Sequence, residues 1–398
     1  MNQEGGKPRI LRDSNFRVIL GIVVMSVIGG SLVAPILPSM IEPLGTNEET
    51  VGLVMSVYTF AALISTPFIG VLADRHGRKR VLLPLIVLYG IAGFSVSQAG
   101  TFYQVLILRA FQGIGGAGMM SLGVTLIGDI FSGRARAQAM GYRSSSQSFV
   151  NAGIPFISGT VATVAWFYPF YIYILAFPLA LVTYLYLDVE EHPSQSTLGS
   201  YFRSIFKVMR FKRTLWVYIS NLFVFILLFG LIVYVPILIV RELGLSTMYS
   251  GLTLSIGSAV AAVTATQAGR FFYRFKNHQL VIAGFLLCGI ALLLISFVTS
   301  FIFLIPCIII WGMGFGTVFP ALNTIVTELV SSQLRAGVVS GFTTMTYIGQ
   351  TISPPLFGFI LSQSNLQAVF VAGSLLALLP LAFTLITRYV FKVTGSFE

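Results

Sequence analysis

A run of charged residues at 70–80 lies between two long apolar stretches in the first quarter of the chain. It reads Gly70-Val-Leu-Ala-Asp74-Arg75-His-Gly77-Arg78-Lys79-Arg80 and combines one carboxylate with several cations. Such charges enter hydrocarbon only at a large cost in free energy. Glycine, in turn, suits a tight turn. The run therefore predicts a short charged hairpin at a membrane surface.

Arg109 is the one charged residue that we place within a predicted membrane span. An ionisable side chain inside a membrane indicates a functional site by default. Gln112 follows nearly one helical turn later and can share the face of Arg109. We favour a role for this pair in coupling or in a cavity. The alternative is that Arg109 extends its guanidinium to the nearby membrane interface, because the span begins only a few residues earlier.

Acidic residues are missing from the middle of every predicted span. The candidate titrating groups are then Asp74, Asp129 and Glu328, on the side of the charged hairpin, with Arg109 as an electrostatic modulator. The residues themselves therefore give little support for proton coupling through a membrane-embedded acid.

Other common chemistries lack their residues. Cys288 and Cys307 fall inside apolar runs, and the histidines do not pair at ligand spacing, so we predict neither a disulfide nor a metal site. The phosphate-binding pattern G-x-x-x-x-G-K-[ST] does not occur, which argues against ATP use. We expect no cofactor and no enzymatic activity.

The composition is that of a polytopic membrane protein. Of 398 residues, 56% are hydrophobic and 9% are charged, whereas soluble domains carry about 25% charged residues. The mean hydropathy is +0.89. The net charge of +11 would suit nucleic acid, but the positions of the cations relate to membrane topology instead. We therefore expect the lipid bilayer, and no nucleic acid, as the surroundings of this chain.

Apolar runs near the ~20 residues that a bilayer requires recur twelve times. Because backbone polar groups must be satisfied inside lipid, these runs are helices. The predicted fold class is an all-α integral membrane protein with 12 transmembrane helices. We place the spans at 17–39, 50–72, 81–99, 103–130, 138–162, 167–187, 215–240, 247–271, 279–299, 301–329, 336–362 and 366–391.

The positions of lysine and arginine predict the orientation. Of 24 such residues, 22 fall at the two ends of the chain or in connections on one side of the membrane. Arg241 lies on the opposite side, and Arg109 lies within a span. Cationic connections stay in the cytoplasm, so the sequence predicts a cell (inner) membrane protein with cytoplasmic N- and C-termini.

An internal repeat divides the chain into two pseudo-symmetric halves. The repeat places Gly70 on Gly269 and Asp129 on Glu328. Parallel repeats of this kind are related by an axis along the membrane normal in known transporters. We predict six-helix bundles at 1–187 and 215–398, joined by a cytoplasmic linker at 188–214. The second part of the linker alternates apolar and basic residues, which favours a helix lying on the membrane surface.

The charged hairpin resembles motif A of the major facilitator superfamily, G-x-L-A-D-R-x-G-R-K, at every defining position. In that family the motif holds the cytoplasmic side closed in one conformation, where a carboxylate can face a helix N-terminus and pair with arginine. The resemblance gives this latch role to Gly70, Asp74, Arg75, Gly77 and Arg78, with Asp129 as a further candidate.

Two other stretches resemble motifs of the same superfamily. The sequence around Arg109 and Gln112 is similar to motif B of helix 4. Within the predicted span 138–162, the fifth, Pro155 and Gly159 hold the spacing of the antiporter signature G-x-x-x-G-P-x-x-G-G, although Ile154 and Ser158 replace two of its glycines. Gly153, the glycine just before the replaced position, is a further candidate of this signature. The alternative is that proline and small residues mark a bent, closely packed helix.

The family plan implies a central substrate cavity between the halves. An aromatic and Met-rich cavity with few charges suits lipophilic or amphiphilic solutes better than sugars or phosphates. Each of these side chains has helix packing as its alternative role. The cavity candidates are Met119, Gln147, Asn151, Asn221, Phe225, Tyr234, Asn323 and Gln350.

The resemblance implies a twelve-helix drug:proton antiporter of the multidrug and tetracycline efflux type. Such a protein is a secondary active transporter that exports lipophilic or amphiphilic small molecules in exchange for protons by alternating access. We expect a monomer. The first alternative is an importer or facilitator of a small organic solute, not coupled to protons. A receptor or lipid-handling protein is a third possibility, but the intact charged hairpin argues against it.

Overall fold

The computed structural model describes residues 10–189, 198–199, 203, 212–267, 275–328 and 335–393. Most of the predicted linker, including nearly all of its amphipathic segment, lies outside the described residues. Within the described residues, every element of regular secondary structure is a helix.

The first half of the chain supplies six long helical segments. The short helices η2 (Ala34–Ile36) and α2 (Leu37–Met40) continue α1 after a break at Leu32 and Val33, where Pro35 and Pro38 follow. In the same way, η3 (Val96–Gln98) continues α4 and η4 (Tyr168–Leu175) leads into α7. The main helices are α1 (Ser14–Ser31), α3 (Leu53–His76), α4 (Arg78–Ser95), α5 (Phe102–Ile130), α6 (Gly133–Val161) and α7 (Ala176–Tyr186).

The second half repeats this arrangement. The π-helical turn η5 (Leu238–Glu242) extends α9. The main helices are α9 (Lys212–Ile237), α10 (Thr247–Thr266), α12 (Asn277–Ile295), α13 (Phe301–Glu328), α14 (Arg335–Gln363) and α15 (Leu366–Val393). Helix α5 begins at Phe102 and α13 begins at Phe301, and the internal repeat relates these first residues directly.

All of the predicted spans coincide with helical segments. Ten of these segments are long and apolar enough to cross a membrane. The other two, α6 and α14, are 29 residues long, but polar side chains lower their mean hydropathy. They occupy equivalent places in the two halves. Polar membrane helices lie against protein or a water-filled cavity rather than lipid, which indicates that α6 and α14 lie between the halves.

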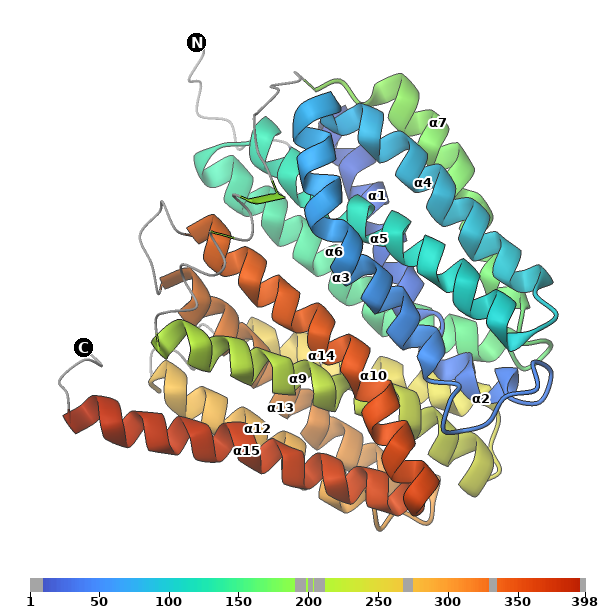
Figure 1. The fold of residues 1–398 in the computed structure, drawn as a ribbon, viewed down its shortest axis with the longest axis vertical. Coiled ribbons are helices and arrows are strands. Elements are labelled where there is room, and N and C mark those ends of the chain that lie inside the picture. The colour runs from blue at the N-terminus through green and yellow to red at the C-terminus, as the bar shows by residue number, and fades with distance from the viewer. Residues whose placement is uncertain are drawn as a thin grey trace.

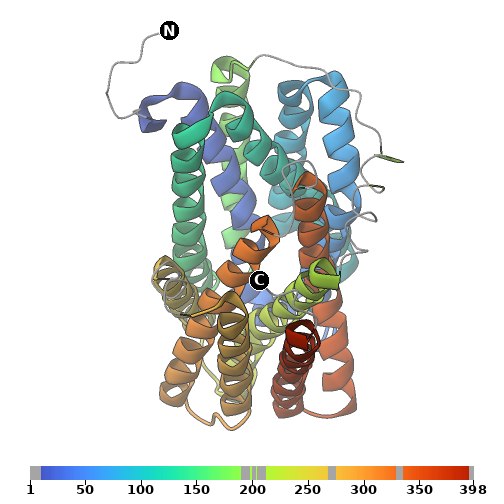
Figure 2. The same cartoon turned by 90° about the vertical axis from the view of Figure 1, so that its left-hand side faces the viewer.

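The helices gather into two bundles (Figure 1). The six segments of the first half, coloured blue to green, form one bundle, and those of the second half, coloured yellow-green to red, form the other. Viewed from the left-hand side, the first bundle lies above the second (Figure 2). The closest contacts between the bundles join α6 to α10 and α3 to α14. These are equivalent pairs under the internal repeat, so the structure is the predicted pair of pseudo-symmetric bundles.

Glycines on α5 allow the first bundle to pack closely. A methyl group at Gly113 would overlap the backbone of Tyr58 in α3, and one at Gly115 would lie 2.7 Å from the carbonyl oxygen of Leu85 in α4. Small residues let membrane helices approach at backbone distance, where van der Waals contact replaces the missing hydrophobic drive. This packing fixes α3 and α4 against the part of α5 that carries Arg109.

Candidate functional site

The charged hairpin joins α3 to α4 at one end of the first bundle, which we call the Asp74 end. Gly77 makes the turn with φ 93° and ψ 141°, a conformation that favours glycine. Arg78, the first residue of α4, forms an ion pair with Asp129 near the end of α5. Lys79 donates to the carbonyl oxygen of Leu187 at 2.6 Å. The hairpin is therefore tied to α5 and to the end of α7 within its own bundle.

Gly70 lies one turn before Asp74 on α3, and a methyl group at this position would meet nothing within 4 Å. Among the residues that the structure describes, none from the second bundle covers this position. Among the residues predicted to form a latch between the bundles, Arg78 and Asp129 thus pair with each other inside the first bundle.

Arg109 is fully buried in the first bundle. Its Nη1 donates to the side-chain oxygen of Gln112 at 2.6 Å, and its Nε donates to the carbonyl oxygen of Val54 at 3.3 Å. Its guanidinium carbon lies 4.3 Å from the ring centre of Tyr58, which is cation–π distance. The interfacial alternative for Arg109 is wrong, because the guanidinium points into the bundle and bonds there.

The opposite end of the molecule, which we call the Glu42 end, is where the two bundles meet. A methyl group at Gly251 of α10 would overlap the carbonyl oxygen of Pro155 in α6. A methyl group at Gly52 would lie 2.9 Å from the Cβ of Pro354 in α14. The internal repeat relates these two contacts to each other. The bundles therefore pack at backbone distance on both sides of the pseudo-two-fold axis.

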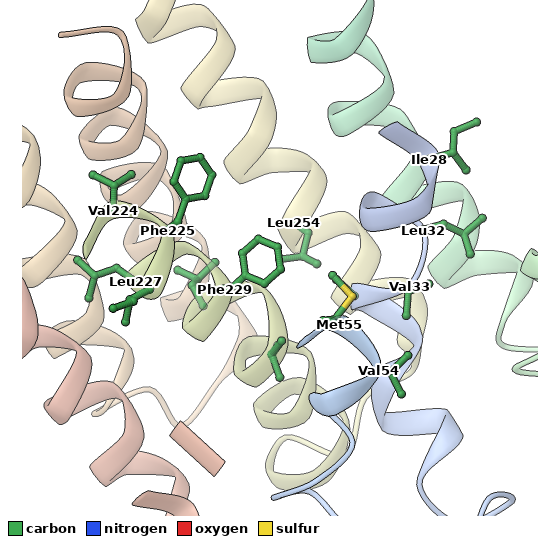
Figure 3. Packing of buried hydrophobic residues seen from close by; sticks show 14 of the residues in the cluster. Ile28, Leu32, Val33, Val54, Met55, Val224, Phe225, Leu227, Phe229 and Leu254 are labelled. Carbon is green, nitrogen blue, oxygen red and sulfur yellow. The ribbon is translucent and has the colours of Figure 1, made fainter. Parts of the chain in front are cut away.

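Hydrogen bonds reinforce both sides of this contact. Thr247 donates to the carbonyl oxygen of Gly159 at 2.8 Å, and the backbone N–H of Phe156 donates to Ser255 at 3.1 Å. On the other side, the hydroxyls of Thr59 and Thr351 lie 3.0 Å apart. Buried side chains from both bundles, including Met55 of α3 and Phe229 of α9, fill the region next to these contacts (Figure 3).

An ion pair crosses the axis at the Glu42 end. Arg241 Nη1 lies 2.8 Å from Glu42 Oε1, and its Nε lies 3.6 Å from Glu48 Oε1. Glu42 and Arg241 are themselves equivalent under the internal repeat, so the pair joins matching positions of the two halves. Arg241 thus connects the bundles where they pack together. In the sequence it was the one basic residue predicted on the side of the membrane opposite to the other basic connections.

The helix-5 signature residues divide between two environments. Pro155 and Gly159 lie in the backbone contact with α10 described above. Gly153 has open space where a methyl group would project. Close helix packing therefore accounts for two of the three residues in this structure.

Arg143 also lies well inside a predicted span, although Arg109 was counted as the one charged residue there. It lies ten residues after the start of α6, within the predicted span 138–162. Its Nη2 lies 3.4 Å from the sulfur of Met120 in α5, and the Nε2 of Gln147 lies 3.7 Å from the same sulfur. In the count of lysine and arginine residues that predicted the orientation, Arg143 was included in the connection before this span.

Two cavity candidates, Asn221 and Tyr234, are buried among the helices of the second bundle, and a third, Asn323, is partly exposed. Asn221 is fully buried and donates to the carbonyl oxygen of Phe342 at 2.9 Å and to Thr346 at 2.8 Å. Tyr234 is fully buried and donates to the carbonyl oxygen of Pro354 at 2.9 Å. Asn323 donates to a carbonyl of its own helix at 3.1 Å. The donors of these side chains are satisfied within the second bundle, as buried polar groups usually are.

The remaining cavity candidates differ in their exposure. Met119 is fully buried, whereas its neighbour Met120 is partly exposed. Asn151 is exposed, and Gln147 and Gln350 are partly exposed, on the polar helices α6 and α14. Phe225 belongs to an aromatic cluster of the second bundle, with its ring centre 5.4 Å from that of Phe319.

In the described part of the chain, no group of three or more His, Cys, Asp or Glu side chains could hold a metal ion. The candidate residues described above carry arginine, amide, thioether and aromatic side chains. Two like bundles of membrane-spanning helices that pack across an axis are the architecture of a membrane transporter.

The sequence pattern of the Major Facilitator Superfamily matches residues 19–349 and 262–394. The chain belongs to this superfamily, whose members are transporters and not enzymes.

Two bacterial relatives and one solved structure illustrate the similarity. The chain is 26% identical to the bacillibactin exporter of Bacillus subtilis, over 94% of this chain and 96% of that protein. It is 25% identical to the quinolone resistance protein NorA of Staphylococcus aureus, over 83% and 86%. Among structures, a bacterial homologue of the lysosomal transporter Spinster, inward-facing and unoccupied, has a TM-score of 0.77 at 17% identity, with 99% and 98% of the two chains covered.

Proposed function

We propose that the protein exports lipophilic or amphiphilic small molecules from the cytoplasm in exchange for protons, by alternating access. The contact of the two bundles at the Glu42 end is the observation that carries this proposal. It uses pairs of glycine and proline at equivalent positions, so one rigid-body rotation of the bundles would break both sides together. The curated relatives that are named as an exporter and a drug-resistance protein support the direction of transport.

The proposed orientation places the Asp74 end in the cytoplasm. The concentration of basic residues in connections at that end supports it through the positive-inside rule. The start of α1 lies at the same end, because Asn15 exchanges hydrogen bonds with the backbone of Asp188 and the neighbouring Leu187 accepts from Lys79. In this orientation the structure corresponds to the state that is closed to the outside. We propose a monomer as the working unit, since the two bundles of one chain complete each other.

Substrate flux into proteoliposomes, measured with and without an imposed pH gradient, tests the proposal. Accumulation driven by the pH gradient is expected. Flux that equilibrates the solute and ignores the gradient would instead favour a facilitator. That second function gains weight from one observation: every Asp and Glu of the chain lies outside the middle of the spans.

We predict that Asp74→Asn lowers transport about three- to tenfold while membrane insertion stays normal. The carboxylate would stabilise the state in which the Asp74 end is closed, in the way that charge stabilises helix ends and arginine pairs, and about 0.3–1 kcal/mol is typical of each such contact. Transport in proteoliposomes and elution of the purified protein on gel filtration are the measurements. Asp188→Asn, the same change at the same end outside the hairpin, is the control. Equal transport by wild type and Asp74→Asn would refute the latch role.

We predict that Arg241→Gln opens the Glu42 end only slightly. The ion pairs of Arg241 are largely exposed, and exposed pairs contribute about 0.2–1 kcal/mol. A shift of about fivefold or less in the ratio of the two states is therefore expected, and it should shrink further in high salt because exposed charges are screened. Distances between nitroxide labels across the Glu42 end would measure it. A complete loss of the closed state would show that the ion pair, and not the helix packing, holds this end.

A further inference from the structure

We propose, resting on the export function above, that the transported solute is an aromatic anion. Its negative group would bind Arg143 in the first bundle, and its ring would stack on Phe315 and Phe319 in the second. The argument uses the bonding of Arg143, the face on which it lies, and what the second bundle carries at the equivalent place.

Arg143 has an incomplete set of partners. The nearest acceptor of its Nη2 is the sulfur of Met120, and a thioether is a weak acceptor. Its buried Nε has no hydrogen-bond partner in the described part of the chain, where Arg143 also forms no ion pair. A guanidinium presents five donors in a planar fork that matches a carboxylate. An unpaired arginine of this kind within a helical bundle therefore has the donors for an anionic ligand.

Helix α6 turns a polar face and an apolar face to different surroundings. Ser144, Gln147 and Asn151 follow at helical spacing and continue the face that begins at Arg143. Phe149 and Phe156, which are 79% and 42% exposed, lie on another face of the helix. Aromatic side chains suit lipid contact and amides do not. Arg143 therefore lies at the edge of the face directed between the bundles.

The second bundle carries aromatic rings where the first carries Arg143 and Met120. The internal repeat relates Met120 to Phe319 and Arg143 to Phe342. The ring centres of Phe319 and Phe342 lie 6.5 Å apart with an interplanar angle of 25°. A pseudo-two-fold axis places equivalent residues at equal distances on its opposite sides. Arg143 with Met120 on one side of the axis is therefore matched by the aromatic rings of Phe319 and Phe342 on the other side.

The cluster of aromatic rings around Phe319 extends along α13. Phe315 and Phe319 are partly exposed and stack with ring centres 5.6 Å apart and planes 9° from parallel. Phe225 of α9 meets Phe319 edge-on at 5.4 Å. On a different face of α13, Ile309 and Met313 are exposed. The stacked pair presents a flat apolar surface, which favours an aromatic ring in offset stacking.

The charges also exclude other solutes. A cationic solute would need a carboxylate for its positive group, yet the acids of the chain lie at helix ends and in connections. A phosphate-rich solute would need several cations together. In the described part of the chain, Arg143 is the one arginine with a hydrogen bond to Met120 at this place. One arginine opposite one aromatic surface selects a single negative group attached to an aromatic body.

Binding of three probes to the purified full-length protein tests the inference, because binding is measured without transport or a pH gradient. The probes are 2-naphthoate, its neutral amide 2-naphthamide, and the cation 2-naphthylmethylammonium, which share one ring system. Wild type is expected to bind the carboxylate about tenfold or more tightly than the amide, since a hydrogen bond to a charged group is worth more than a neutral one. The cation should bind most weakly.

Variants of Arg143 and Phe319 separate the contribution of the arginine from that of the aromatic rings. Arg143→Gln should abolish the preference for the carboxylate and leave amide binding within about twofold of wild type, and Arg143→Lys should keep part of the preference. Phe319→Ala should weaken carboxylate and amide equally. Arg134→Gln, which removes the same charge from an exposed position of α6, is the control and should behave as wild type.

Thermal unfolding without ligand checks that each variant is folded. An unchanged carboxylate preference in folded Arg143→Gln, or tighter binding of the cation by wild type, would overturn the inference. The proposed export function would survive either result. Conversely, a pH-independent flux would overturn proton exchange and leave the binding result standing.

Discussion

Replacing Gly251 by alanine is expected to open the Glu42 end and to lower transport about tenfold or more. A Cβ atom at this position would overlap the carbonyl oxygen of Pro155. Both groups belong to helix backbones, so the clash cannot be relieved by a side-chain rotation. Overpacking of this kind costs about 1–3 kcal/mol, which corresponds to a shift of roughly 5–150-fold between two states. The variant should therefore favour the state in which α6 and α10 are apart.

Spin labels at Tyr103 and Ile302 would measure the opening. These residues stand at the starts of α5 and α13, are 77% and 72% exposed, and are equivalent under the internal repeat. The native cysteines, Cys288 and Cys307, are buried and compete little for the label. In the wild type the distance distribution should be dominated by the short, closed population. In Gly251→Ala the long population should dominate.

Gly153→Ala is the matched control for Gly251→Ala. It makes the same substitution in a helix of the same contact, at a position where a methyl group meets nothing within 4 Å. Its transport and its distance distribution should match those of wild type. A closed distance distribution in Gly251→Ala would show that the packing of α6 on α10 does not control this end.

The helical part of the fold could be predicted because lipid leaves the backbone few choices. Each apolar run had to become a helix, and the internal repeat required two like bundles. The same repeat contained more information than the sequence alone revealed. It relates Glu42 to Arg241 and Gly52 to Gly251. That Glu42 pairs with Arg241, and that each glycine contacts a proline of the other bundle, follows only from the relative placement of the bundles.

The assignment of single side chains depended on helix rotation, which composition does not determine. Met119 and Met120 are neighbours in sequence, yet one is fully buried and the other reaches Arg143 and Gln147. Successive residues of a helix differ by about 100° in direction. Asn221, a polar residue in an apolar helix, proved to bond to a distant part of the sequence in α14. A helical wheel of α6 would have placed Arg143 beside Gln147, and this was the available signal that sequence reasoning missed.

Replacing Arg109 by methionine is expected to separate transport from stability. The variant should melt within a few degrees of wild type, or above it, while transport falls about tenfold or more. Arg109 is fully buried without a carboxylate partner in the described part of the chain, so its charge carries a desolvation cost that an apolar side chain of similar length does not. What the protein gains from the arginine must therefore lie in function.

The bonds of Arg109 indicate why transport should suffer. Its partners Val54 and Tyr58 belong to α3, and the same helix contacts α14 through Thr59 and Gly52. The arginine thereby fixes the rotation of the helix that forms one side of the contact between the bundles. Methionine lacks the donors for Val54 and Gln112 and the charge for the ring of Tyr58.

Transport in proteoliposomes and thermal unfolding, measured on the same preparations, check this prediction. Arg109→Lys should fall between wild type and Arg109→Met, because an ammonium keeps the charge but not the planar fork that reaches Gln112 and Val54 together. Arg17→Met, which removes a charge from an exposed position of α1, should transport normally. Normal transport by Arg109→Met, or a large loss of its melting temperature with transport lost in proportion, would assign Arg109 a purely structural role. A lysine variant as active as wild type would instead show that the charge alone suffices, without the directed bonds that hold α3.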